Sequence, residues 1–141
     1  MRRRHAFTLI ELLIVVVILA ILAAAVIPQF TDSTTDAKRS TGVMNLHTLR
    51  AQIQMYKVQH NGSPPAVLTK LTEKTDASGA AGTDFGPYLQ FLPVNPFTSK
   101  NTVTAASSNP PTAVTSGSNR GWLYHAASGN VWLDETGYLN Q

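Results

Sequence analysis

Residues 2–28 read RRRHAFTLIELLIVVVILAILAAAVIP, and this stretch decides how the N-terminal part of the chain folds. Three arginines precede a long apolar run that contains a single charged residue, Glu11. The twenty residues from Leu12 to Thr31 are all uncharged, and a helix of that length spans the hydrocarbon core of a bilayer, about 30 Å thick. Because clusters of arginine stay in the cytoplasm, we expect the rest of the chain outside it.

The apolar stretch has two competing interpretations, a cleaved signal peptide and a retained membrane anchor. Ala23, Ala24 and Ala25 form a small-residue site of the kind that signal peptidase cuts. The apolar segment 7–27, however, is longer than the ~7–15 residues of a signal peptide's apolar core. A carboxylate in a membrane segment costs free energy and usually has a function. Glu11 therefore favours the anchor, and a soluble secreted protein cut after Ala25 is the alternative.

The segment 6–12, Ala-Phe-Thr-Leu-Ile-Glu-Leu, resembles the processing site of type IV pilins and of the pseudopilins of type II secretion. The resemblance implies that a prepilin peptidase cuts between Ala6 and Phe7 and methylates the new amine of Phe7. The family usually has glycine before the cut, and Ala6 is small enough to take its place. Glu11 then corresponds to the conserved glutamate at the fifth mature position of the family.

The resemblance also gives Glu11 and Pro28 roles in a filament. Helices of many subunits bundle together, and Glu11 of one subunit meets the positive N-terminal amine of Phe7 in a neighbour. Opposite charges attract more strongly in a low-dielectric setting than in water, so the pair would set the register of assembly. Proline removes a helical hydrogen bond, and Pro28 predicts either a kink at the outer end of the membrane span or an ordinary helix end.

A second helical pattern follows the membrane segment. Apolar residues recur there at three- and four-residue spacing, which predicts an amphipathic helix over 31–62: Val43, Leu46, Leu49, Ile53 and Tyr56. The sequence His-Asn-Gly at 60–62, before Ser-Pro-Pro at 63–65, predicts its end. We therefore expect a leader at 1–6, a membrane and assembly helix at 7–30, a continuation of this helix to residue 62, and a small head at 63–141.

The head has few regular patterns. Residues 68–73 predict a short helix, and the Ser/Thr-rich segment 99–120 predicts a long surface loop. The segment 86–97, GPYLQFLPVNPF, predicts irregular packing and is similar to a stretch of the major, G-type pseudopilin. Segments 122–125 and 130–133 flank a turn and predict an antiparallel hairpin with Trp122 and Trp132 in its core. The expected fold class is α+β, a long N-terminal helix packed against this head.

The charge of the chain is concentrated at its N-terminal tip. There are 11 Lys and Arg residues against 8 Asp and Glu, a formal net charge of +3. Arg2, Arg3 and Arg4 account for the whole excess. No basic stripe with interleaved aromatic residues remains, so we do not expect nucleic-acid binding.

Residues able to carry chemistry are scattered, so we expect no catalytic site. The histidines lack paired metal-ligand spacing, and His47 and His60 are predicted on the helix surface; the four are His5, His47, His60 and His125. Several G-type pseudopilins hold calcium in an acidic C-terminal loop. Here that region offers only Asp134 and Glu135, with Thr136 nearby, whereas calcium needs six to eight oxygens. We therefore carry over no calcium ligand and expect no cofactor.

The absence of cysteine favours a pseudopilin, because major type IV pilins often close a C-terminal loop with a disulfide. The resemblance implies a structural subunit, anchored by one span in the bacterial inner membrane with its head in the periplasm. It would polymerise with itself into a filament that crosses the periplasm and drives protein export. Its further partners would be minor pseudopilins, the prepilin peptidase, an inner-membrane assembly platform and lipid. A surface type IV pilin for adhesion, motility or DNA uptake is the alternative.

Overall fold

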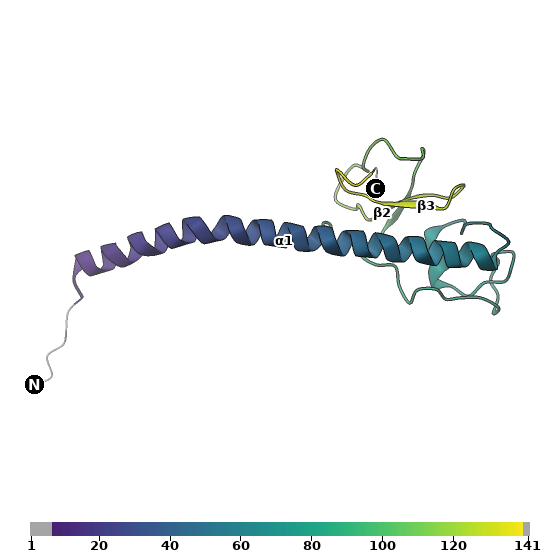
Figure 1. The fold of residues 1–141 in the computed structure, drawn as a ribbon, viewed down its shortest axis with the longest axis horizontal. Helices are drawn as coiled ribbons and strands as arrows, with labels where there is room; N and C mark the ends of the chain where they lie inside the picture. Colours follow the sequence, from purple (N-terminus) through teal and green to yellow (C-terminus); the bar gives the residue numbers. More distant parts are fainter. Residues whose placement is uncertain (1–6, 140–141) are drawn as a thin grey trace, which may run out of the picture. The chain divides into compact units, whose positions relative to one another are not determined.

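The computed structural model describes residues 7–139, except for the side chain at position 28. The chain divides into two compact units, Met1–Ala37 and Lys38–Gln141. One helix, α1 (Leu9–Gln59), contributes residues to both units. The other elements follow it in the second unit (Figure 1): η1 (Leu68–Thr72, a 3₁₀ helix), β1 (Val103–Ala105), β2 (Trp122–His125) and β3 (Asn130–Leu133). The expected α+β fold with a long N-terminal helix is confirmed.

The C-terminal end of α1 lies where the sequence predicts it. Asn61 and Gly62 follow the helix with positive φ angles of 54° and 82°. The Gly62 amide donates to the Lys57 carbonyl oxygen at 2.8 Å. A left-handed residue with such a bond satisfies a carbonyl that the helix itself leaves without a partner. The chain therefore stops being helical at the predicted Asn-Gly pair.

In the unit Met1–Ala37, every side chain that the structure describes is exposed, from Phe7 to Ala37. The large apolar side chains are included; Ile18, for example, is 51% exposed. A helix that is apolar on all sides needs lipid or other protein around it. Within 7–139, α1 is the one helix long and apolar enough to cross a membrane.

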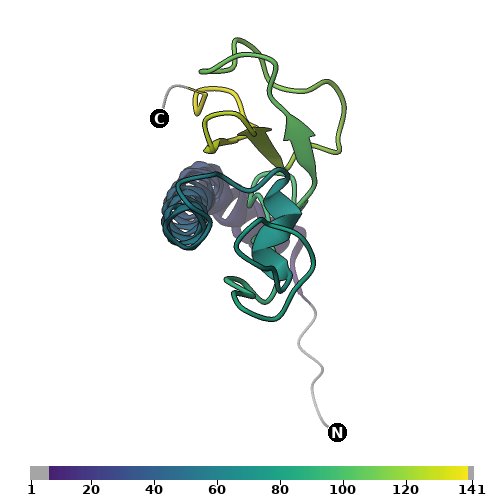
Figure 2. The ribbon, with the colours of Figure 1, turned by 90° about the vertical axis from the view of Figure 1, so that its right-hand side faces the viewer.

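The core of the second unit forms between the later part of α1 and the head. The predicted face of α1 is confirmed, because four of its five residues are at most 3% exposed and Val43 is half-buried: Leu46, Leu49, Ile53 and Tyr56. Figure 2, which looks along α1, shows η1 and the sheet beside this end of the helix. Their contributions to the same core are Leu68, Leu71, Trp122, Tyr124, Val131 and Leu133.

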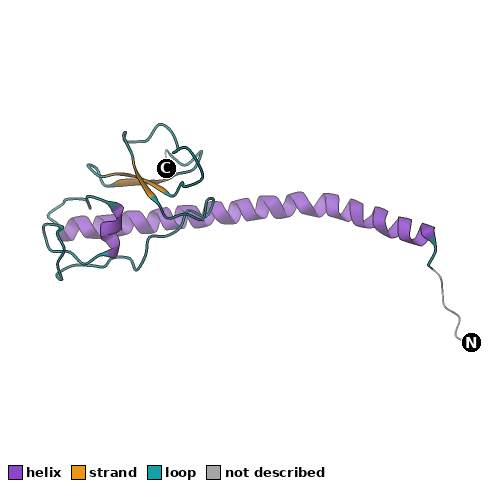
Figure 3. Cartoon of the chain, turned by 180° about the vertical axis from the view of Figure 1, so that it is seen from behind, coloured by secondary structure: helices purple, strands orange, loops and turns teal. Residues whose placement is uncertain are grey.

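The sheet has the strand order β1-β2-β3, and its strands are drawn in orange in Figure 3. β2 and β3 are antiparallel, with Trp122 opposite Leu133, so the predicted hairpin is confirmed. Both tryptophans are buried as predicted, Trp122 at 0% exposure and Trp132 at 4%. The third strand, β1, pairs with β2 in parallel, with Val103 opposite Trp122.

The prediction that 99–120 is entirely loop was wrong, because β1 lies within it. A three-residue strand is too short to produce an alternating pattern, and its pairing partner comes later in the chain. The Trp122 amide donates to the Thr102 carbonyl at 2.8 Å, and the Ala106 amide donates to the Tyr124 carbonyl at 2.8 Å. At Gly121 the two backbones meet so closely that a Cβ would lie 2.7 Å from the Thr102 nitrogen. Glycine is therefore required where β1 and β2 come together.

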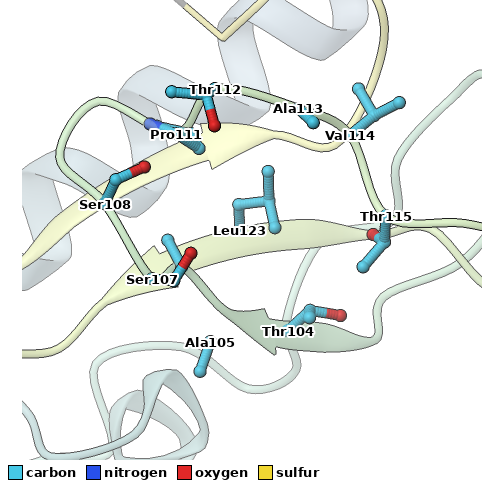
Figure 4. Close-up of a pocket in the computed structure, with 11 residues that line it drawn as sticks. Thr104, Ala105, Ser107, Ser108, Pro111, Thr112, Ala113, Val114, Thr115 and Leu123 are labelled. Carbon is cyan, nitrogen blue, oxygen red and sulfur yellow. The ribbon is translucent and has the colours of Figure 1, made fainter.

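Both faces of the sheet are covered. Trp122 and Tyr124 belong to the core with α1, so Leu123, between them in the strand, points to the opposite face. Leu123 is only 3% exposed because the loop 106–115 lies over that face. Figure 4 shows Leu123 among residues of this loop and of β1, which together line a hollow of ≈ 160 Å³. The loop therefore completes the burial of the hairpin.

The segment 86–97 packs without helix or strand, as predicted. Asn95, which is fully buried, organises it: its side-chain nitrogen donates to the Gly121 carbonyl at 3.2 Å, and its side-chain oxygen accepts from the Phe97 amide at 2.9 Å. The indole nitrogen of Trp122 donates to the Pro93 carbonyl at 2.7 Å. Side-chain hydrogen bonds to backbone thus replace the regular ladder in this segment.

Candidate functional site

The predicted cleavage site lies at the edge of the described chain. Ala6 is outside the described residues, so the bond before Phe7 stays a prediction. Phe7 itself precedes the first residue of α1, and its side chain is 76% exposed. The residue expected to become the mature N-terminus is thus accessible and outside the helix.

Glu11 and Thr8 form a reciprocal cap at the start of α1. The Glu11 amide donates to Thr8 Oγ1 at 3.2 Å. In return, Glu11 Oε2 accepts from the Thr8 amide and from Thr8 Oγ1, both at 2.8 Å. This is a capping box, in which two orphan amides of the first turn gain partners. The carboxylate also lies at the positive end of the helix dipole, where negative charge is favourable.

Sequence reasoning missed the capping role of Glu11. The signal was present as Thr-x-x-Glu before an apolar run, the usual pattern of a capping box. The cap holds one carboxylate oxygen close to the backbone of the first turn. Apart from Thr8, the exposed neighbours of Glu11 are apolar, among them Phe7, Leu9 at 84% and Ile10 at 63% exposure. The site is therefore one fixed negative charge within an apolar surface.

Around Pro28 the helix continues without interruption. The alternative of an ordinary helix end at Pro28 was therefore wrong, because α1 extends to Gln59. The kink itself stays a prediction. Several hydroxyl groups after it bond to helix carbonyls: Thr31 Oγ1 donates to the Ile27 oxygen at 3.2 Å and Ser33 Oγ to the Gln29 oxygen at 2.9 Å. Such hydroxyls compete for helix carbonyls and often bend a helix.

The two histidines predicted on the helix surface differ. His47 is exposed, as predicted, but His60 is only 2% exposed, so its prediction was wrong. His60 stacks on the Tyr56 ring at 3.6 Å between centroids, and its Nδ1 lies 2.7 Å from the Tyr56 carbonyl oxygen. Its Nε2 lies 2.9 Å from Thr75 Oγ1. The three- and four-residue spacing of the core positions 53, 56 and 60 is the signal that identifies it.

The acidic residues of the C-terminal region do not assemble a metal site. Within 7–139, no group of three or more His, Cys, Asp or Glu side chains is placed to hold a metal ion. Asp134 is fully buried, and its Oδ1 accepts from the Thr115 amide at 2.9 Å. Glu135 Oε2 lies 3.3 Å from Nη2 of Arg120. With one carboxylate facing an arginine, this donor set does not fit the calcium ion that the resemblance implies.

Burial raises the pKa of Asp134 above its ordinary value. The Thr115 amide and the positive charge of Arg120 act in the opposite direction, and a repulsive effect of Glu135 adds to the rise. The balance shows that desolvation of the carboxylate is the larger effect at this position.

Comparisons with known proteins give matches for the N-terminal segment and for most of the chain. A family described as "Prokaryotic N-terminal methylation motif" matches residues 1–27. The chain is 35% identical to the type II secretion system core protein G of Pseudomonas aeruginosa over 68% of its length and 70% of that protein. It is 33% identical to the protein of the same name from Aeromonas hydrophila, over 68% and 69% respectively.

A protein of a different description also matches. The chain is 35% identical to a fimbrial protein of Neisseria meningitidis over 110 residues, which is 75% of this chain and 58% of that protein. No solved structure gives a significant match.

Proposed function

The chain belongs to the family of the type II secretion system core protein G, and on that premise we propose that it is a structural subunit of a periplasmic filament for protein export. The subunit enters the inner membrane through α1 and polymerises from there. The observation that carries the proposal is Glu11, a capped carboxylate on an apolar helix that its own chain leaves uncovered.

The exposed N-terminal part of α1 supports both stages of this cycle. Before assembly, lipid covers the uncharged span from Leu12 to Thr31. In the filament, the same side chains pack against the helices of other subunits. Burying a large aliphatic side chain contributes about 1.5–3 kcal/mol, so the run of exposed leucine, isoleucine and valine residues supplies a strong drive to remain covered in either state.

Glu11 supplies the register of that packing. A carboxylate has about four acceptor positions, and the bonds from Thr8 occupy positions on Oε2. The remaining positions can accept hydrogen bonds from the charged amine of Phe7 in a neighbouring subunit. Removing one partner of a buried ion pair costs about 3–5 kcal/mol, so packing registers that leave the carboxylate unpaired are disfavoured.

Replacement of Glu11 tests the proposal, and two variants separate its two roles. Glu11→Gln keeps an acceptor for the Thr8 cap but removes the charge, whereas Glu11→Ala removes both. We expect both variants to insert in the membrane and be processed, and neither to form filaments in cells. Asp32→Asn, an exposed change on the same helix, is the control and should assemble normally. Filament formation by Glu11→Gln at the wild-type level would contradict the registry role.

A surface pilus is the second candidate, favoured by the match to the fimbrial protein. Long extracellular pili on intact cells, labelled with an antibody against the head, would support it over a periplasmic filament. In either case we propose a structural protein without catalysis or nucleic-acid binding. Its further partners would be minor pseudopilins, the prepilin peptidase and the assembly platform of the inner membrane.

A further inference from the structure

The corner where the loop before β2 meets the end of β3 concentrates charged groups in the head. Asp134 follows β3 directly and is fully buried, and its amide donates to the Gly121 carbonyl at 3.2 Å. The next residue, Glu135, faces Arg120, with Nη2 and Oε2 at 3.3 Å and both side chains mostly covered, at 24% and 19% exposure. The corner thus joins two acidic residues and one guanidinium.

Polar atoms with no hydrogen-bond partner gather at the same corner. Among the described residues, the buried side-chain atoms without one are Thr115 Oγ1, Arg120 Nε and Asp134 Oδ2. A carboxylate oxygen and a guanidinium N–H are complementary, since one accepts and the other donates. A buried carboxylate without a cation carries a large desolvation cost. The positive charge of Arg120 also acts on the Asp134 carboxyl.

We propose that the guanidinium of Arg120 is the cation that holds this corner together, and that the head therefore needs no calcium ion there. A guanidinium presents five donors in a planar fork, so one side chain can serve two carboxylates. Calcium would need six to eight oxygen ligands. The corner offers two carboxylates, and Asp134 Oδ1 already accepts from the Thr115 amide. A second cation would also be repelled by Arg120.

The corner fixes the loop that covers the sheet. Thr115 is the last residue of the covering loop 106–115, and Arg120 lies in the segment that joins this loop to β2. The Asp134 carboxylate holds the Thr115 backbone. The backbone around Arg120 is also anchored, since Thr98 Oγ1 donates to the Arg120 carbonyl and Thr102 Oγ1 to the Asn119 carbonyl. Loss of the guanidinium should therefore loosen the loop over Leu123 before it affects the core on α1.

Thermal unfolding of the full-length protein in detergent tests the proposal. The wild type is measured with excess CaCl₂ and with EDTA, beside Arg120→Gln, Arg120→Lys and the exposed control Arg39→Gln. We expect the wild-type Tm to be the same in both solutions. Arg120→Gln should lower Tm by about 4–8 °C, Arg120→Lys should lower it less, and Arg39→Gln should leave it unchanged. Adding Glu135→Gln to Arg120→Gln should recover part of the loss, because it removes an unpaired charge.

Limited proteolysis gives a second readout, because it distinguishes local loosening of the loop from a general loss of stability. Arg120→Lys should be cut faster within 106–120 than the wild type, at a temperature where both are folded.

A wild-type Tm that rises with CaCl₂ or falls with EDTA would overturn the proposal in favour of a metal site. A Tm of Arg120→Gln equal to that of Arg39→Gln would overturn it as well. Should Arg120→Gln not fold, Arg120→Lys and the two wild-type measurements decide. The proposal does not depend on which filament the subunit builds.

Discussion

The two parts of helix α1 differ in where their apolar side chains find cover. From residue 9 to 37 every described side chain is exposed, and the sequence from Leu12 to Ile27 is apolar on all sides of the helix. From residue 38 to 59 the helix is amphipathic, and its apolar face packs in the core of the head. In one continuous helix, the apolar side chains of the later segment are buried by the chain's own head. Those of the earlier segment have to be buried by lipid or by other subunits.

Both segments are helical, so helix formation alone does not distinguish the membrane and assembly segment from the segment that supports the head. Ile18 and Ile53 are identical residues in the same helix, yet Ile18 is 51% exposed and Ile53 is fully buried. Burial of such a side chain is worth about 1.5–3 kcal/mol. Burial of the later segment stabilises the folded head. Burial of the early segment instead favours membrane insertion and assembly, where lipid or other subunits cover its side chains.

Removal of residues 1–30 should have the largest effect. The shortened protein keeps the second unit, Lys38–Gln141, and loses the apolar span. We expect a soluble, folded monomer that neither binds membranes nor forms filaments. Circular dichroism, thermal unfolding and size-exclusion chromatography measure this. An unfolded or detergent-dependent product would show that the head relies on the missing segment.

The paired isoleucines compare the two segments directly. Ile53→Ala should lower the free energy of unfolding of the head by about 2–5 kcal/mol, the usual cost of a cavity at a buried aliphatic residue. Ile18→Ala removes the same atoms from an exposed position and should leave this free energy unchanged. Denaturant unfolding of both variants in the same detergent gives the comparison. Equal losses would contradict the assignment of Ile53 to the core.

The two histidines give a smaller contrast within the second unit. His60→Leu should destabilise the head by about 1–3 kcal/mol, because it removes the buried hydrogen bond between His60 Nε2 and Thr75 Oγ1. His47→Leu changes an exposed side chain, so its effect should stay within about 0.5 kcal/mol. Urea unfolding of both variants measures the difference. The prediction fails if the His60 variant is as stable as the His47 variant.

The smallest expected effect concerns pH and Asp134. Burial raises the pKa of this carboxyl in the folded protein above its value in the unfolded chain, which is about 4. At a pH between these two values, the folded state binds more protons than the unfolded state. The contribution of Asp134 to stability therefore falls as pH rises through this window. Asp134→Asn keeps an acceptor and has no charge. The Tm of the variant minus that of the wild type should therefore increase across this window.

A neighbouring carboxylate gives the opposite sign and so serves as the control. The pKa of Asp76 is lowered chiefly by the hydrogen bond from the Ser78 hydroxyl. Its contribution is present above the unfolded pKa and is lost as pH falls. The Tm of Asp76→Asn should therefore fall less than that of the wild type as the pH is lowered. The same direction of change in both variants would contradict the two assignments.

Long and strongly patterned elements could be predicted from the sequence. The spacing of Leu46, Leu49 and Ile53 identifies the buried face of α1, and the Asn-Gly pair at 61–62 identifies the end of the helix. The hairpin strands were also predicted, since short apolar runs flank a glycine turn. β1 was not, because a three-residue edge strand depends on a partner distant in the chain. The depth of His60 was missed although it extends the same helical spacing.

The candidate site was predicted in its identity but not in its geometry. The segment around Glu11 identifies it by resemblance, whereas its bonds with Thr8 follow from the Thr-x-x-Glu spacing of a capping box. The corner of Arg120 and Asp134 could not have been found, because its members lie in irregular segments that only the fold brings together. Cleavage at Ala6 and the kink at Pro28 stay predictions.

The intact mass and N-terminal sequence of the protein taken from the cell envelope decide whether Glu11 can pair with the amine of a neighbouring subunit. We expect a mature chain that begins at Phe7 with a methylated amine, which would place Glu11 at the fifth position and supply the charge that it is proposed to meet. A chain that begins at Val26, or one that retains Met1, would contradict the role of Glu11 in assembly, because Glu11 would then be removed or would have no nearby amine to pair with.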